Sequence, residues 1–172
     1  MKEIPITFNN DMVRAILDGR KTQTRRVIEP QPELTEGWWG MNPQNGIYIR
    51  MWRDGFSPSK LFTYSECPYG VPGDILLVRE TFNGDPMPRD AARIFLRVLN
   101  VRVDLVQDIS AKDIKAEGVI PVESSSVFVN EMKTKGLFVN LWDSIYAKRG
   151  AGWDDNPWVW VVEFERIENY KI

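Results

Sequence analysis

The longest β-rich segment of the chain, residues 93–106, changes the phase of its apolar side chains near its middle. Ile94, Leu96 and Val98 follow one alternation, and the apolar residues from Val101 onward follow the opposite one. Successive side chains of a strand point to opposite faces, so a change of phase requires a bulge or a bend. We expect it near Leu99 and Asn100. Bent strands suit a small barrel, and this segment therefore favours a strand-rich, barrel-like core.

Short helices and further strands are expected around that core. One helix is expected to start at Asn10 or Asp11 and to end at Gly19. A second starts at Ser110, with Asp113 three residues later, and Gly118 stops it. A third helix is expected at about 130–148, and strands at 75–80 and 158–165. The sequence predicts an α+β fold over 1–172, formed as a single domain.

Residues 28–72 differ in composition from the rest of the chain, because proline and glycine recur throughout them. A segment of this length is too long for an unstructured connection, so we interpret it as an insertion with its own short strands. The expected strands are Ile47–Trp52 and Leu61–Tyr64. Its aromatic residues either form a small satellite core or line a surface on which bases stack. These residues are Trp38, Trp39, Trp52, Phe56, Phe62 and Tyr64.

The composition excludes several kinds of site. The chain has no histidine, which removes Ser-His-Asp and Cys-His catalysis, and its single cysteine, Cys67, excludes an intramolecular disulfide and a cysteine-clustered zinc site. We therefore expect no metal and no cofactor. The formal charge of −2 excludes a chain that is basic overall, so any contact with a nucleic acid must use a local basic patch. No apolar run approaches the length of a membrane span, and we expect a cytoplasmic protein without a membrane partner.

A basic, hydroxyl-rich stretch follows Gly19 and is the first candidate site. It contains Arg20, Lys21, Thr22, Thr24, Arg25 and Arg26. One interpretation is a solvated turn that leads into an edge strand, and the other is a site for an anion or a phosphate. In a strand, Thr24 and Lys21 would point to opposite faces, so the two can cooperate only if Lys21 belongs to the turn.

Glu117 is the second candidate, because it stands in the last turn of the helix that Gly118 ends. A carboxylate there faces the negative end of the helix dipole. This signal is weak alone, since most such glutamates are ordinary surface residues.

Together these segments resemble the ASCH domain family, which has a PUA-like β-barrel fold. The resemblance rests on Leu17-Asp18-Gly19-Arg20-Lys21-Thr22-Gln23-Thr24, on Gly73-Asp74 and on Ala116-Glu117-Gly118. The segments Leu141–Tyr146 and Asn156–Val161 resemble the variant found in phages and prophages. The resemblance covers residues 1–27 and 73–172 and implies a PUA-like barrel with short flanking helices, interrupted by the Pro/Trp-rich insertion.

Within that family the chain is similar to a bacterial subgroup of N4-acetylcytidine amidohydrolases. The resemblance implies a metal-independent amidohydrolase that acts on an acylated cytidine-type nucleoside, with Lys21, Thr24 and Glu117 as catalytic residues. Two alternatives stay open: a non-catalytic module that binds RNA or a modified nucleotide, and a ribonuclease on the same fold. The ligand is then a nucleoside or an RNA. The sequence does not indicate the acyl group or the oligomeric state.

In this interpretation the lysine is the base that activates the threonine. Thr24 is a poor nucleophile until a base takes its proton, and without histidine that base is Lys21. Lowering a lysine pKa from about 10.4 to near 7 requires about 4 kcal/mol, which burial and neighbouring arginines can supply. Glu117 is expected to face the substrate rather than Lys21. Residues expected to bind substrate are Arg20, Thr22, Arg25 and Arg26, with Arg26 placed to hold an oxyanion or a ribose or phosphate oxygen.

Overall fold

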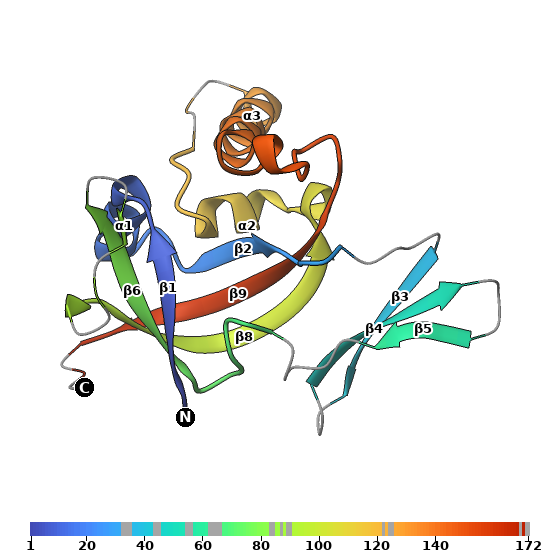
Figure 1. The fold of residues 1–172 in the computed structure, drawn as a ribbon. Coiled ribbons are helices and arrows are strands. Elements are labelled where there is room, and N and C mark those ends of the chain that lie inside the picture. The colour runs from blue at the N-terminus through green and yellow to red at the C-terminus, as the bar shows by residue number, and fades with distance from the viewer. Residues whose placement is uncertain are drawn as a thin grey trace.

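The main body of the chain is a curved sheet with three helices packed on it, as a computed structural model shows (Figure 1). The structure describes residues 1–31, 36–42, 46–53, 57–61, 67–82, 85–86, 88, 91–121, 123, 126–168 and 170. For the strands within 36–61 and for residues 81–82 and 85–86 it describes the backbone alone.

The main sheet has the order β1-β6-β8-β9-β2. These strands are β1 (Glu3–Phe8), β2 (Gln23–Val27), β6 (Ile75–Phe82), β8 (Phe95–Leu105) and β9 (Trp158–Ile167). The short β7 (Asp85–Pro86) pairs with β6. Strands β1 and β6 are parallel, and the other pairs along the path are antiparallel. The register of β8 against β9 shifts between Val98 and Asn100, which confirms the predicted bulge.

The sheet is mixed and open, with β1 and β2 at its two edges. The α+β class with short flanking helices is confirmed, while backbone pairing among the described strands does not close the expected barrel. A side chain spans from one edge to the other instead: Nη2 of Arg26 on β2 donates to the carbonyl oxygen of Thr7 on β1 at 2.7 Å.

Two short helices end at glycines in the left-handed conformation. Helix α1 (Asn10–Leu17) is capped by Asn9, one residue earlier than expected, and Gly19 follows it with φ +72°. Helix α2 (Ala111–Ala116) has the predicted capping box between Ser110 and Asp113. Gly118 follows α2 with φ +89°, and a Cβ there would lie 2.9 Å from the Cβ of Ala15. Only glycine therefore fits where the end of α2 meets α1.

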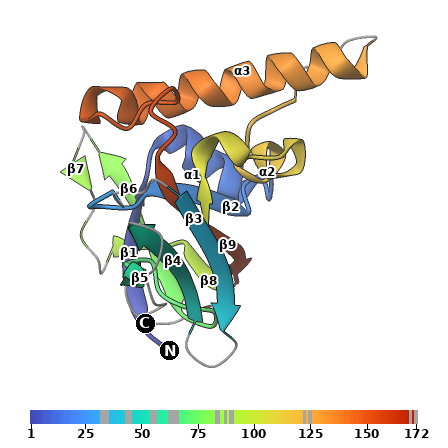
Figure 2. The ribbon, with the colours of Figure 1, turned by 90° about the vertical axis from the view of Figure 1, so that its right-hand side faces the viewer.

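Helix α3 (Val127–Tyr146) starts three residues before the expected position and is capped by Ser126. The short 3₁₀ segment η4 (Ala147–Arg149) extends it to Gly150, and another, η3 (Val106–Asp108), links β8 to α2. Figures 1 and 2 both place α3 over α2 and the end of the sheet that carries β2. In the view of Figure 2, α3 lies across the top of the molecule.

Strand β9 lies between two hydrophobic clusters, one on each face of the sheet. Trp160, Val162 and Phe164 pack into the cluster that contains β1, α1, β6 and β8. Val159 and Val161 pack on the other face against α2 and α3. The strand is thus buried on both faces at first and exposes Glu165 near its end. The two faces of the sheet are covered by different helices, and this division positions the site.

The segment between β2 and β6 contains a second sheet of three antiparallel strands. It has the order β3-β4-β5, from β3 (Glu36–Asn42), β4 (Gly46–Arg53) and β5 (Ser57–Leu61). The strand expected at Ile47–Trp52 lies within β4. The one expected at Leu61–Tyr64 lies outside the described residues except for Leu61, the last residue of β5. The satellite core and the stacking surface both depend on side chains that lie outside the described residues.

Strand β1 was missing from the sequence-based prediction. Pro5 argues against a strand because it lacks an N–H donor, but β1 is an edge strand, where proline is tolerated. Among the described residues, no helix combines the length and the apolar character needed to cross a membrane.

Candidate active site

The turn between α1 and β2 brings Lys21 to the end of α2. The backbone N–H groups of Arg20 and Lys21 both donate to the carbonyl of Ala15 at 2.9 Å, which holds the turn on α1. Lys21 then pairs with Glu117 in an isolated antiparallel bridge, and β2 starts two residues later at Gln23. Lys21 therefore belongs to the turn, as cooperation with Thr24 requires.

The side chains of Lys21 and Glu117 form a buried ion pair. Nζ of Lys21 lies 2.8 Å from Oε2 of Glu117 and also donates to the Glu117 carbonyl oxygen at 3.0 Å. The lysine side chain is 1% exposed and the glutamate 7%. The expectation that Glu117 faces a substrate instead of Lys21 was wrong. The backbone bridge places the two residues opposite each other, so their side chains meet.

Arg25 takes the other oxygen of the same carboxylate. Its Nη1 lies 3.2 Å from Oε1 of Glu117, and its Nη2 lies 3.3 Å from Oδ2 of Asp113, one turn earlier on α2. The guanidinium is 1% exposed. Helix α2 therefore presents two carboxylates, four residues apart, to a single buried arginine on β2.

The network continues from Asp113 to strands β8 and β9. Arg102 donates to Oδ1 of Asp113 at 3.1 Å and also pairs with Glu163. With its amide oriented to match these neighbours, Gln23 donates to Asp113 at 3.0 Å and accepts from Arg102 at 3.1 Å. The chain of charges alternates in sign, which stabilises groups that would be costly to bury alone.

Burial lowers the pKa of Lys21, because desolvation disfavours its charged form. The carboxylate of Glu117 opposes this by attraction and by its hydrogen bond, whereas the positive charges of Arg26 and Arg25 lower the pKa further. Phe8 adds to the enclosure, since its ring centroid lies 5.7 Å from Nζ of Lys21. The site thus holds a buried lysine whose proton is more easily lost than in water.

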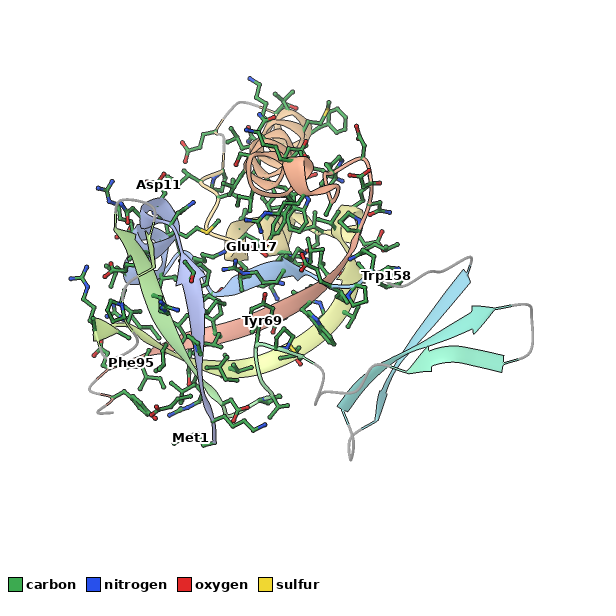
Figure 3. The ribbon with its side chains drawn as sticks, in the orientation of Figure 1. Met1, Asp11, Tyr69, Phe95, Glu117 and Trp158 are labelled. Atoms are coloured by element: carbon green, nitrogen blue, oxygen red, sulfur yellow. The ribbon has the colours of Figure 1, made fainter. Side chains whose placement is uncertain are left out.

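Thr24 borders a small cavity at the free edge of the sheet. Helix α3 supplies the opposite wall, and Figure 3 shows Glu117 between β2 and α3. The cavity is lined by Met12, Thr24, Arg25, Arg26, Glu117, Phe138, Leu141, Trp142, Ile145 and Tyr146. Because β2 is an edge strand, the cavity is reached by consecutive residues from both of its faces.

The cavity has a volume of about 30 Å³. A single water needs about 10–15 Å³ on this measure, so there is room for two waters or one small polar group. Aromatic side chains of α3 form the wall opposite β2. The centroids of the Trp142 and Tyr146 rings lie 4.3 Å apart, and Trp142 Nε1 donates a hydrogen bond to the Ala151 carbonyl at 2.9 Å. A cavity of this volume does not hold a nucleoside.

The structure separates the four residues expected to bind substrate. Arg25 and Arg26 line the cavity, whereas Arg20 and Thr22 are exposed and are absent from its wall. Arg20 donates to the Gly118 carbonyl at 2.9 Å and pairs with Asp18, so it closes the turn. Arg26 lies over the Phe8 ring at 5.1 Å, in addition to its bond to Thr7.

The sequence analysis missed the partners that complete the site. Asp113, Arg102 and Gln23 extend the ion network, and Met12, Trp142 and Tyr146 line the cavity. Two signals were present. Asp113 and Glu117 are four residues apart on one helix, and the buried residues Thr134, Phe138, Trp142 and Tyr146 recur every four residues along α3.

Other nucleophiles and metals find no support in the described residues. Cys67 is buried, and burial raises the pKa of its thiol to about 12, so its reactive thiolate form is rare near neutral pH. No group of three or more Cys, Asp and Glu side chains gathers as metal ligands would within the part of the chain that the structure describes.

No family model and no curated protein matches the chain. Among solved structures, one similar chain comes from Lactobacillus crispatus JV V101, with 12% identity, a TM-score of 0.41 and coverage of 96% of this chain and 79% of that one. That structure from L. crispatus is described as an ASCH domain.

Two other solved structures are similar. A protein from Enterococcus faecalis V583, assigned to the family DUF984, has 10% identity and a TM-score of 0.48, with coverage of 100% of this chain and 86% of that one. The hypothetical protein PH0355 has 15% identity and a TM-score of 0.43, with coverage of 97% and 100%. Similarities at these identities and TM-scores assign no function to the site.

Proposed function

We propose that the protein is a metal-independent amidohydrolase that removes an acyl group from the exocyclic amine of a cytidine-type nucleoside. In this proposal Thr24 is the nucleophile, Lys21 is the base, and Glu117 orients the lysine. Support comes from the geometry of Lys21 and Glu117, two residues that lie 96 positions apart in the sequence and meet at the same buried site.

The two hydrogen bonds of Lys21 carry this proposal. A neutral amine has two N–H groups and one lone pair. Nζ has two acceptors, the carbonyl oxygen and Oε2 of Glu117, at 3.0 and 2.8 Å. In the neutral form these acceptors occupy both N–H groups and leave the lone pair free to accept a proton. Glu117 thus fixes the direction of the lone pair, which is a requirement for a base.

The reaction then proceeds in two halves. Lys21 takes the Thr24 hydroxyl proton while Oγ1 attacks the acyl carbonyl carbon, and collapse of the tetrahedral intermediate breaks the bond to the nucleoside nitrogen. That nitrogen leaves with the proton from Lys21 and an acyl-threonine remains. Water attacks the ester, gives its proton to Lys21, and the carboxylic acid leaves as Thr24 Oγ1 regains a proton. The balance is amide plus water to acid plus amine.

The cavity places a condition on this reaction. Its volume of about 30 Å³ accommodates a small acyl group but no nucleoside, so the base and sugar require a displacement of α3. Trp142 and Tyr146 are the aromatic side chains nearest to such an opening, since both line the cavity. The same helix excludes bulk water from the closed site.

The state of the basic residues disfavours the alternative, a module or a ribonuclease that grips an RNA backbone. Lys21 and Arg25 are each 1% exposed and are paired with carboxylates. They cannot contact a phosphate without breaking those pairs. Of the four cations in the stretch, only Arg20 is exposed, and it is paired with Asp18.

An activity assay tests the proposal. The purified protein is incubated with N4-acetylcytidine, and chromatography measures the cytidine and acetate that are released. We expect turnover by the wild-type protein and none by Lys21→Arg, because arginine cannot give up its proton at accessible pH. Arg97→Met is the matched control, since Arg97 forms a half-exposed ion pair with Glu165. Turnover by Lys21→Arg would show that the lysine is not the base, and tight RNA binding without turnover would favour the alternative.

A further inference from the structure

The carboxylate of Glu117 is shared between two buried cations, one on each oxygen. Oε2 lies 2.8 Å from Lys21 Nζ, and Oε1 lies 3.2 Å from Arg25 Nη1. A carboxylate that belonged to Lys21 alone would hold the ammonium form tightly, because attraction between opposite charges is strong in a buried pair. Such a lysine would be a poor base. The second cation is therefore the feature that needs an explanation.

Arg25 is held in place independently of Lys21. Its Nη2 lies 3.3 Å from Oδ2 of Asp113, and Asp113 is itself fixed by Ser110 and by Arg102. Ser110 anchors Asp113 through the capping box of α2. These contacts place the guanidinium beside the Glu117 carboxylate and next to Lys21.

Lys21 is faced by charged or titratable groups from several elements. Glu117 comes from the end of α2, and Arg25 and Arg26 come from β2. Tyr146 of α3 lies within reach of Arg26 and Glu117. Strand β1 contributes the uncharged ring of Phe8, and α1 contributes the backbone carbonyl of Ala15. Among the cations that face Lys21 in the described part of the chain, Arg25 alone forms an ion pair with the Glu117 carboxylate that Lys21 uses.

We propose that Arg25 is a positioning residue: it occupies Oε1 of Glu117 and places a second positive charge beside Lys21, so that the lysine works as a base rather than as a permanent ion-pair partner. This inference rests on the proposed function for its catalytic meaning. The effect of Arg25 on the protonation of Lys21 can be measured without any substrate.

NMR titration of the full chain, labelled with ¹³C-lysine, tests it. The Lys21 signal is assigned by its loss in Lys21→Arg, and its titration midpoint is followed in Arg25→Met. We expect the midpoint to rise by about one pH unit or more, because the variant removes repulsion and leaves Glu117 to Lys21 alone. Arg97→Met, which alters an ion pair at the surface, leaves the midpoint unchanged.

Two further variants decide the question if Arg25→Met does not fold. Arg25→Lys keeps the positive charge and should leave the midpoint near that of the wild type. Asp113→Asn removes an anion that faces Arg25 and should move the midpoint to lower pH. An unchanged or lower midpoint in Arg25→Met, or an unchanged or higher one in Asp113→Asn, overturns the proposal.

The pH profile of kcat/KM separates this inference from the proposed function. If the wild type turns over acylated cytidine, its ionisation should move with the NMR midpoint in each variant. A moved midpoint in a protein without turnover would support the role of Arg25 in Lys21 protonation and reject the proposed function. Turnover with an unmoved midpoint would do the reverse.

Discussion

Gln23 and Arg25 point to one face of β2, and Thr24 and Arg26 to the other, in surroundings that differ sharply. On the first face, α2 supplies Asp113 and Glu117, and both side chains of β2 are bound to fixed charges. On the second, Thr24 borders a cavity. Adjacent residues of one strand thus have different surroundings, although Arg25 also borders the cavity, because the two faces of the sheet are covered by different elements.

The comparison predicts its largest effect at Thr24. Thr24→Val replaces the hydroxyl with a methyl group of similar size, and we expect deacylation to fall by at least about 1,000-fold, because the variant lacks the proposed nucleophile. The free energy of unfolding should change by less than about 1 kcal/mol, since the shape of the side chain is kept. Steady-state assays and urea denaturation measure the two quantities.

Thr22→Val is the matched control for this change, because Thr22 is exposed and precedes the strand. It should leave both activity and stability close to those of the wild type. Equal loss of activity in the two variants would show that the threonines act structurally, and the division between the faces of β2 would fail.

Substitutions on the face of β2 that carries Gln23 and Arg25 should lower the free energy of unfolding. Arg25→Met leaves the buried carboxylate of Glu117 and the partly exposed carboxylate of Asp113 with one partner fewer. Breaking a buried pair such as Arg25–Glu117 costs about 3–5 kcal/mol. The exposed pair between Arg97 and Glu165 offers the contrast, since Arg97→Met should cost less than about 1 kcal/mol. Urea denaturation of both variants checks the difference, and similar losses would contradict it.

Arg26 tests the open side of the sheet and should give an intermediate effect. Arg26→Met removes the bond from β2 to the Thr7 carbonyl on β1, and a hydrogen bond from a charged group contributes about 1.5–3 kcal/mol. Amide hydrogen exchange should rise along β1 more than along β8. The control is Arg166→Met, because Arg166 donates to the Leu17 carbonyl at 3.3 Å from an exposed position.

The smallest effect is expected from salt. A nucleoside carries no phosphate, so its binding releases no counterions, and KM should stay nearly flat as ionic strength rises. Binding of single-stranded RNA through several cations would instead weaken with a slope of about −0.7 per neutralised phosphate. Steady-state assays at increasing KCl concentration measure this effect. A steep dependence of KM on salt would mean that the cations of the basic stretch are free to bind phosphates instead of being paired with carboxylates.

Local signals predicted the parts of the fold that are set by nearby residues. The bulge in β8, the capping box of Ser110 and the turn at Gly118 each follow from sterics or hydrogen bonds within a few residues. Strand β1 was not among the predicted elements. Its position places Pro5 in an edge strand, where proline is tolerated, and being at an edge is a property of the whole sheet.

The candidate site was only partly predictable for the same reason. Lys21, Thr24 and Glu117 could be named from their motif, but the sharing of Glu117 with Arg25 depends on how α2 packs on β2. The aromatic wall of the cavity depends on the packing of α3. The buried residues of this helix recur every four positions, but that spacing does not indicate which part of the molecule they pack against. Such contacts join distant segments, and no spacing in the sequence encodes them.

The bridge between Lys21 and Glu117 also determines when the site forms during folding. The residues are 96 positions apart, so their contact closes a long loop and its entropy must be offset by the surrounding sheet. Strands β6 and β8 lie within that loop and pair with each other. We therefore expect the site to form late in folding, because closing a long loop carries an entropic cost that earlier strand pairing offsets. An intermediate that lacks the central strands has the motif but no lysine–glutamate pair, and recovery of activity during refolding would report the final step of assembly.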